Sequence, residues 1–216
     1  MSLADQISTV LTEFGATAPD EVKQPINSAN EYIQKNFQHD KAIQVGAKLP
    51  KFNLENAMGH AVTSTELLQG GPLLISFYRG EWCPFCNITL AALQKHLGDF
   101  SAKGVTLVAI SPELPDQSLS TTEKHGLKFP VLSDKGNHYA RELGLVWSQP
   151  ESMRVTLTKL GADLPKRNGD DSFDIPVPAA ILVDRTGVLR NTYIEPNWTK
   201  RVEPTELLRW VDALEL

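Results

Sequence analysis

The stretch LLISFYRGEWCPFC, residues 73–86, decides how this chain folds. Its first six residues form a mostly apolar run that is typical of a buried strand. Behind it, apolar residues recur at helical spacing as far as Phe100, and residues 105–110 form a second apolar run. A strand, a long helix and a second strand predict a right-handed crossover between two parallel strands.

Downstream of the second strand, the chain continues to alternate helices and short strands. Asp116 and Asp134 are each placed to cap the start of a helix, while Gly126 and Gly144 are placed to end it. Between these two helices, residues 129–132 predict a further short strand.

The C-terminal part of the chain predicts a hairpin followed by a final helix. Residues 179–183 and 188–194 flank Asp184-Arg185-Thr186-Gly187, a turn with glycine at the position that favours a positive φ. Glu203-Pro204 then opens a last helix, because proline is well tolerated at the first helical position. Residues 45–216 are therefore expected to form an α/β domain, a mixed sheet flanked by helices.

Residues 1–44 predict a helical arm that is separate from this domain. A first apolar stripe stops before Gly15, and a second stripe follows over residues 22–37, with Pro25 as a start or a kink. An apolar stripe does not identify its partner, so the arm either packs on its own domain or forms a homodimer.

Residues 147–177 fit the alternating plan least well. They allow a helix that ends near Gly161, followed by a polar loop over residues 166–174. We interpret residues 147–177 as an insertion that serves as a lid or an interface.

The composition is that of a globular chain and argues against several partners. Of the 216 residues, 41% are hydrophobic and 22% are charged, and the net charge is −5. Because no basic block is present, neither duplex DNA nor an anionic membrane surface is expected as a partner. The first residues lack the pattern of a signal peptide, and the apolar runs are too short to cross a bilayer. We therefore expect a soluble protein of the reducing cytoplasm.

The two cysteines of the chain, Cys83 and Cys86, lie where the first strand ends and the helix begins. A helix N-terminus carries partial positive charge and unpaired N–H groups, both of which stabilise a thiolate. The thiolate is the reactive form of cysteine. Pro84 suits the first helical turn, since its missing N–H would have no partner there. The C-x-x-C spacing therefore indicates redox or metal chemistry.

Helical spacing separates the roles of the two sulfur atoms. Cys86 heads the apolar stripe and should face the sheet, whereas Cys83 lies at the helix edge and should be more exposed. We therefore expect Cys83 to be the nucleophile and Cys86 to be the resolving thiol. Arg79 would favour the Cys83 thiolate, Glu81 would oppose it, and Trp82 would shield the thiol from water.

Two other interpretations compete with redox chemistry at this cysteine pair. Both residues could be inert structural cysteines, but their place at a strand-to-helix turn argues against that interpretation. A zinc site needs four ligands, and only His96 lies nearby in the sequence. We therefore expect no metal and no other cofactor.

Over residues 45–213, the chain resembles peroxiredoxins of the thiol-specific antioxidant and alkyl hydroperoxide reductase type, which belong to the thioredoxin-fold superfamily. The resemblance is carried by Phe77-Tyr78, Ser111-Pro112, the run over residues 129–134 and the hairpin over residues 182–187. It implies a thioredoxin-like mixed sheet. It also implies reduction of hydrogen peroxide, alkyl hydroperoxides or peroxynitrite at one cysteine, with a thioredoxin or glutathione system as the reductant.

The resemblance breaks down at the active loop, which reads Pro-x-x-x-Thr/Ser-x-x-Cys in peroxiredoxins. Here Arg79 stands at the proline position, Cys83 at the threonine position and Cys86 at the peroxidatic cysteine, while Pro178 stands where peroxiredoxins have a downstream arginine. The C-P-F-C motif and Pro178 instead resemble thioredoxin and glutaredoxin, which implies a cis Val177–Pro178 bond facing the dithiol. The peroxiredoxin comparison thus makes Cys86 the attacking sulfur, and the thioredoxin comparison makes it Cys83.

The leading interpretation is a thiol-dependent peroxide reductase. Cys83 and Cys86 would cycle through a sulfenic acid and an intramolecular disulfide. One alternative is a thioredoxin- or glutaredoxin-like thiol–disulfide oxidoreductase with weak peroxidase activity. Another is a redox sensor without turnover, which the N-terminal arm favours.

Overall fold

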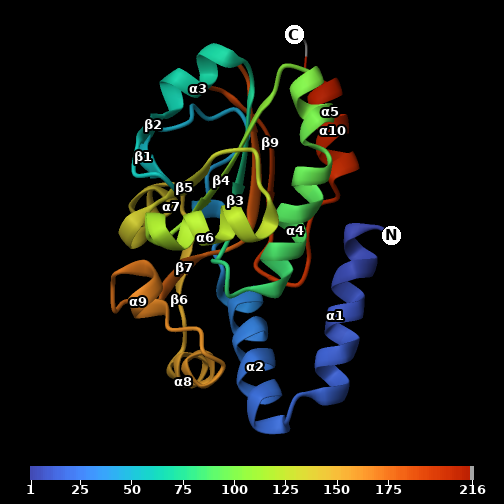
Figure 1. The fold of residues 1–216 in the computed structure, drawn as a ribbon, viewed down its shortest axis with the longest axis vertical. Coiled ribbons are helices and arrows are strands. Elements are labelled where there is room, and N and C mark those ends of the chain that lie inside the picture. The colour runs from blue at the N-terminus through green and yellow to red at the C-terminus, as the bar shows by residue number, and fades with distance from the viewer. Residues whose placement is uncertain (215–216) are drawn as a thin grey trace.

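The computed structural model describes residues 1–214 and is built around a seven-stranded mixed sheet (Figure 1). Along the sheet the strands follow the order β2-β1-β5-β4-β3-β8-β9. Their bounds are β1 Asn53–Asn56, β2 Ala61–Thr63, β3 Leu73–Phe77, β4 Thr106–Ser111, β5 Val131–Ser133, β8 Ala179–Val183 and β9 Leu189–Ile194. Strand β4 is parallel to both of its neighbours, β3 and β5, whereas β8 is antiparallel to β3 and β1 is antiparallel to β5. The predicted parallel crossovers and the mixed α/β sheet are therefore confirmed.

Helices cover the sheet and carry the connections between its strands. Those of the domain are α3 Ser64–Gly70, α4 Pro84–Lys95, α5 Leu97–Ala102, α6 Pro115–His125, α7 His138–Glu142 and α10 Pro204–Asp212, with a 3₁₀ turn η2 over Lys135–Asn137. Figure 1 shows α4, α5 and α10 together on one side of the sheet, while α6 packs beside β5. All five residues of β3 are buried, which is why its sequence is mostly apolar.

The long helix predicted after residue 83 is two helices, because the chain changes direction at His96. This residue has φ −100° and ψ 7°, ends α4 and begins α5. The apolar stripe survives the break, since Cys86, Leu90, Leu93 and Phe100 are all buried against the sheet.

The capping predictions are partly correct. Asp134 accepts the N–H groups of Tyr139 and Ala140 in the first turn of α7, although the N-cap residue of that helix is Asn137. Asp116 does not cap α6, because the helix begins one residue earlier, at Pro115, and Asp116 lies in its first turn. Gly126 ends α6 in the left-handed conformation.

The C-terminal hairpin and helix are confirmed. Strands β8 and β9 pair as predicted, and Gly187 in the turn has φ +81°. Helix α10 begins at Pro204, and Leu207 and Val211 on it are buried. Among residues 1–214, no helix is both long and apolar enough to cross a membrane.

The N-terminal arm consists of α1 Leu3–Thr17, α2 Asp20–Asn36 and a 3₁₀ turn η1 over His39–Lys41. Gly15 does not stop α1. The helix continues to Thr17, and Pro19 ends it, because a residue before proline is disfavoured in the α conformation. Pro25 neither starts nor ends α2 but lies inside it.

The buried residues of the arm pack within the chain itself. Leu3 and Ile7 of α1 and Ala29 and Ile33 of α2 belong to the hydrophobic core, with α1 beside α4 and α2 beside α8 (Figure 1). This packing corresponds to the first of the two alternatives for the arm. The homodimer stays a prediction.

The segment over residues 147–177 carries its own small sheet and two helices. Strand β6 Val146–Ser148 pairs antiparallel with β7 Asp174–Pro176, and between them lie α8 Glu151–Lys159 and α9 Leu164–Asn168. The helix expected to end near Gly161 is therefore present, but the start of the predicted polar loop is helical. That this segment is an insertion stays a prediction, and we call residues 146–176 the insertion in that sense.

Candidate active site

The two cysteines are placed by the turn from β3 to α4. Cys83 is the N-cap residue of α4, and its Sγ accepts the backbone N–H of Cys86 at 3.4 Å. Pro84 occupies the first helical position, as predicted. A sulfur that caps a helix receives both a hydrogen bond and the positive end of the helix dipole, which stabilises its negative form.

Both thiols are fully buried, so the prediction that Cys83 is the more exposed of the two is wrong. Helical periodicity locates Cys83 at the edge of its own helix. It does not show which side chains from other parts of the chain bury that edge. Arg79 from the preceding loop lies against Cys83 there, and Trp82 of the same loop and Trp198 from the segment between β9 and α10 pack on its guanidinium. We call Gly80–Trp82 the redox loop.

Arg79 is the group closest to the Cys83 sulfur among the charged side chains described. Its Nη2 donates to Cys83 Sγ at 3.1 Å, and the side chain is only 3% exposed. Its guanidinium carbon lies 4.9 Å from the ring centroid of Trp82 and 4.7 Å from that of Trp198, so it forms cation–π contacts with both indoles. Trp147 of the insertion stacks on Trp198 in turn, at 5.8 Å.

Within residues 1–214, Arg79 has no carboxylate in ion-pair distance, and its Nε and Nη1 have no hydrogen-bond partner. A buried cation is costly unless an anion lies against it. The Cys83 sulfur is the group in position to be that anion. This geometry supports the prediction that Arg79 favours a thiolate at Cys83.

The surroundings of the two sulfur atoms shift their pKa values in opposite directions. Burial alone would raise the pKa of Cys83, but the hydrogen bond with Cys86 and the charges of Arg79 and Arg201 outweigh burial and hold it well below its ordinary value. Burial raises the pKa of Cys86, and the hydrogen bond and negative charge of Cys83 raise it further. These surroundings therefore favour a thiolate at Cys83 over one at Cys86.

Arg201 is a site residue that the sequence did not reveal. Its Nη2 lies 3.5 Å from Cys86 Sγ, while its Nη1 donates to the backbone carbonyls of Trp198 and Lys200. It is separated from Cys86 by 115 residues and lies in an irregular segment before α10. No local pattern could have connected it with the cysteines.

A small cavity of about 20 Å³ opens beside Cys86, enough for a molecule of water's size. Its lining is mostly apolar and includes Cys86, Pro178, Tyr193, Arg201 and Leu3. Pro178 therefore shares this cavity with the second cysteine. Its peptide bond with Val177 is trans, so the expected cis bond is wrong. The thioredoxin comparison that implied it does not extend to this backbone conformation.

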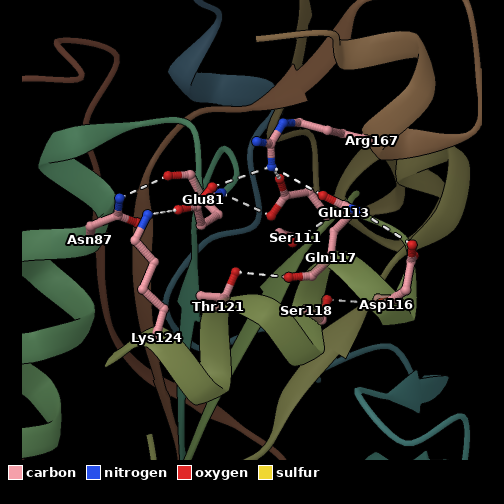
Figure 2. A network of polar contacts seen from close by, with 11 residues as sticks. Glu81, Asn87, Ser111, Glu113, Asp116, Gln117, Ser118, Thr121, Lys124 and Arg167 are labelled. Carbon is pink, nitrogen blue, oxygen red and sulfur yellow. Dashed lines mark hydrogen bonds and ion pairs between the residues drawn. The ribbon is translucent and has the colours of Figure 1, made fainter. Parts of the chain in front are cut away.

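Glu81 does not face the thiols, contrary to expectation. Its carboxylate pairs with Lys124 of α6 and, at 3.3 Å, with Arg167 of α9, while its carbonyl accepts from Asn87 at 2.7 Å (Figure 2). These ion pairs draw its negative charge away from Cys83. Figure 2 shows the same network continuing to Glu113, a buried residue between β4 and α6.

Within the described chain, His, Cys, Asp and Glu side chains do not gather in threes as a metal site requires. His96 hydrogen-bonds Asp99 at 2.9 Å instead of approaching the cysteines.

The mixed sheet with two cysteines at the β3–α4 turn defines a thioredoxin-fold thiol protein. Residues 45–192 match the profile of the AhpC/TSA family, which is more than half of the chain. The chain belongs to the AhpC/TSA family. This membership agrees with the peroxiredoxin resemblance inferred from the sequence.

Individual proteins give the same assignment. The chain is 34% identical over 89 residues to a candidate peroxiredoxin of Mycobacterium tuberculosis, a match that spans 41% of this chain and 56% of that protein. It is 29% identical over 114 residues to peroxiredoxin Bcp of Escherichia coli, spanning 53% of this chain and 72% of Bcp. The matched part is thus little more than half of the first relative's length.

Solved structures confirm the fold. Peroxidoxin BcpB from Mycobacterium tuberculosis superposes with a TM-score of 0.64 at 15% identity, covering 81% of this chain and 99% of BcpB. Peroxiredoxin 6 of Arenicola marina, as a cysteine-to-serine mutant, gives a TM-score of 0.63 at 20% identity, covering 81% and 74% of the two chains. At these identities, the likeness concerns the thioredoxin-like fold.

Proposed function

We propose that this protein is a thiol-dependent peroxide reductase that uses Cys83 and Cys86 as a redox dithiol. The observation that carries the proposal is the contact of Arg79 Nη2 with Cys83 Sγ at 3.1 Å, made by a buried guanidinium without a carboxylate partner among the described residues. Such a guanidinium stabilises the thiolate form of Cys83, and a thiolate is the nucleophile that peroxide reduction needs. Membership in the AhpC/TSA family supports the same activity.

In the proposed cycle, the Cys83 thiolate attacks one oxygen of a hydroperoxide. The S–O bond forms as the O–O bond breaks, and the leaving oxygen takes up a proton to become water or an alcohol. The Cys86 thiol then attacks the sulfenic acid, and a disulfide and a second water are formed. Two thiols of an external reductant finally reopen the disulfide.

The choice of Cys83 as the first nucleophile follows from the charges around it. Cys86 remains a neutral thiol beside the cavity, close to Arg201, where it can act second. The peroxiredoxin comparison, which makes Cys86 the attacking sulfur, is the competing assignment. The reductant is proposed to be a thioredoxin or a glutathione system, and the setting to be the reducing cytoplasm.

Peroxide consumption with a thiol reductant tests this function. The wild type should turn over many times, and the Cys83→Ser, Cys86→Ser double variant should not. Wild-type consumption no faster than that of the double variant would refute the peroxidase. One oxidation per chain without recycling would instead indicate a redox sensor.

A second candidate, a thiol–disulfide oxidoreductase, is favoured by one observation. Cys83 and Cys86 form a C-x-x-C pair at a helix N-terminus, and Cys83 replaces the threonine of the peroxiredoxin loop. Parallel assays with a peroxide and with oxidised glutathione separate the two functions. Disulfide reduction in the absence of peroxide turnover would select this second candidate.

A further inference from the structure

The redox loop is held by a buried carboxylate from the next crossover. Glu113 is fully buried, and its Oε2 accepts the backbone N–H of Glu81 at 2.8 Å. Gly80 comes so close that a Cβ there would lie 3.0 Å from Glu113 Oε1 and 2.4 Å from Trp82 Nε1. The Glu113 carboxylate therefore fixes the backbone immediately before Trp82.

Arg167 of the insertion holds this carboxylate from the other side. Its Nη1 lies 3.2 Å from Glu113 Oε1 and 3.3 Å from Glu81 Oε2 (Figure 2). Its backbone carbonyl also accepts the N–H of Leu114, the residue next to Glu113. The insertion is thus tied to the redox loop by one cation that lies between two carboxylates.

The consequence for the dithiol follows from what the loop covers. Trp82 packs on the Arg79 guanidinium, which lies on the Cys83 sulfur, and that sulfur has no exposed surface. A thiol or disulfide of a large partner therefore cannot touch Cys83 while the loop is in this position. A small peroxide needs a smaller opening than such a partner does.

Building on the proposed function, we propose that Glu113 and Arg167 are positioning residues that hold the redox loop closed over Cys83. The insertion thereby limits the dithiol to small substrates until the loop opens for a bulky thiol or disulfide partner. Neither residue contacts a cysteine in the structure, so both act through the loop.

Ionisation of Glu113 provides a readout of this role. Burial raises the pKa of Glu113 to about 7, against the opposing effects of the Glu81 N–H and of Arg167. Opening the loop would bring water to the carboxylate, which favours its charged form. A rise in pH through neutrality should therefore promote opening. The titratable or charged groups around Glu113 are Glu81, Arg167 and Tyr78. Those around Glu81 include Arg167, Lys124 and His125.

The test compares two maleimides of different size on reduced protein. A Cys86→Ser background leaves Cys83 as the only thiol. Its reaction with N-ethylmaleimide and with a maleimide on a polyethylene glycol chain is followed by mass spectrometry between pH 6 and pH 8. Both reagents need the thiolate, so the ratio of their rates cancels the ionisation of Cys83 and reports how open the loop is.

In the Cys86→Ser protein with an otherwise unchanged loop, the rate with the bulky maleimide divided by the rate with N-ethylmaleimide should rise from pH 6 to pH 8. Glu113→Gln keeps an oxygen for the Glu81 N–H but cannot ionise, so its ratio should stay low at every pH. Arg167→Met removes the cation between two carboxylates, and its ratio at pH 8 should rise about tenfold above wild type. The matched control is Lys166→Met, an exposed neighbour on α9, which should behave as wild type.

A ratio in Arg167→Met equal to that of Lys166→Met at pH 8 would overturn the proposal, provided that circular dichroism shows both proteins folded. If Arg167→Met does not fold, the other variant decides. A pH-independent wild-type ratio, or a Glu113→Gln ratio that rises like wild type, would equally refute it. Alkylation does not depend on peroxide turnover, so this result stands apart from the peroxidase assay.

Discussion

Cys83 and Cys86 lie three residues apart and are equally buried, but they meet different surroundings. Cys83 lies against a guanidinium that contacts two indoles, whereas Cys86 lies beside a mostly apolar cavity with Arg201 at 3.5 Å. Burial alone would raise both pKa values. The comparison teaches that the hydrogen bond between the two sulfur atoms and the nearby cations, and not exposure, decide which of two buried thiols carries the negative charge.

Removing each sulfur in turn tests this comparison most directly. Cys83→Ser should lower peroxide turnover at least about a thousandfold, to the level of the double variant, because the thiolate itself is lost. Without an external thiol, Cys86→Ser should still consume one equivalent of peroxide rapidly and then stop, since the chain has no second thiol to resolve the sulfenic acid. Rapid-quench measurement of the first turnover distinguishes the two. The reverse pattern would assign the attack to Cys86.

Glu113, which holds the redox loop next to Cys83, should make the stability of the folded protein depend on pH. Because burial raises its pKa from 4.5 to about 7, the folded protein binds a proton that the unfolded chain releases across this range. The free energy of unfolding should therefore fall by about 3 kcal/mol from pH 4.5 to above pH 7, by the linkage between pKa and stability. Glu113→Gln should lack this part of the pH dependence.

Urea denaturation of both proteins at several pH values measures this difference. Other titrating groups contribute a background that is common to both, so the difference between them isolates Glu113. Glu123→Gln, an exposed position on α6, serves as the control. Parallel pH profiles for wild type and Glu113→Gln would show that Glu113 titrates normally.

Replacing Arg79 should largely abolish the contrast between the two sulfur atoms. Arg79→Met removes the cation that contacts Cys83, so the pKa of Cys83 should rise and its alkylation by iodoacetamide at pH 7 should slow about thirtyfold. The exposed Arg185→Met variant has the same change in charge and should react at the wild-type rate. An unchanged rate in Arg79→Met would leave the helix N-terminus as the source of the thiolate.

Arg201 should have a smaller effect, because it lies against Cys86 and acts on the Cys83 charge from farther away. Arg201→Met should slow the alkylation of Cys83 about threefold to fivefold at pH 7. The same iodoacetamide assay, run beside Arg79→Met, ranks the two arginines. A loss as large as that of Arg79→Met would mean that the two cations act as a unit.

Local sequence predicted those parts of the site that local structure determines. The apolar run of β3, the proline at the start of α4 and the glycine turn between β8 and β9 each depend on a few neighbouring residues. Arg79 was found for the same reason, because it lies only four residues before Cys83. The parallel pairing of β3 with β4 then followed from the crossover rule.

The rest of the site depends on contacts between distant parts of the chain. Trp198 and Arg201 come from an irregular segment after β9, which has no periodicity to mark its direction. Arg201 lies against Cys86, and Trp198 packs on the Arg79 guanidinium that lies against Cys83, so the burial of Cys83 could not be predicted from its place on its own helix. Glu81 was assigned to the thiols because it is near them in sequence, but Lys124 and Arg167 hold it elsewhere.

The aromatic cluster around Arg79 gives the protein a built-in optical reporter. Three of its four tryptophans, Trp82, Trp147 and Trp198, lie in one contact chain with that guanidinium, while Trp210 hydrogen-bonds Glu206 on α10. Loss of the Cys83 charge on oxidation changes the electric field at these three indole rings. Indole emission should therefore follow each redox cycle in real time, without an added dye.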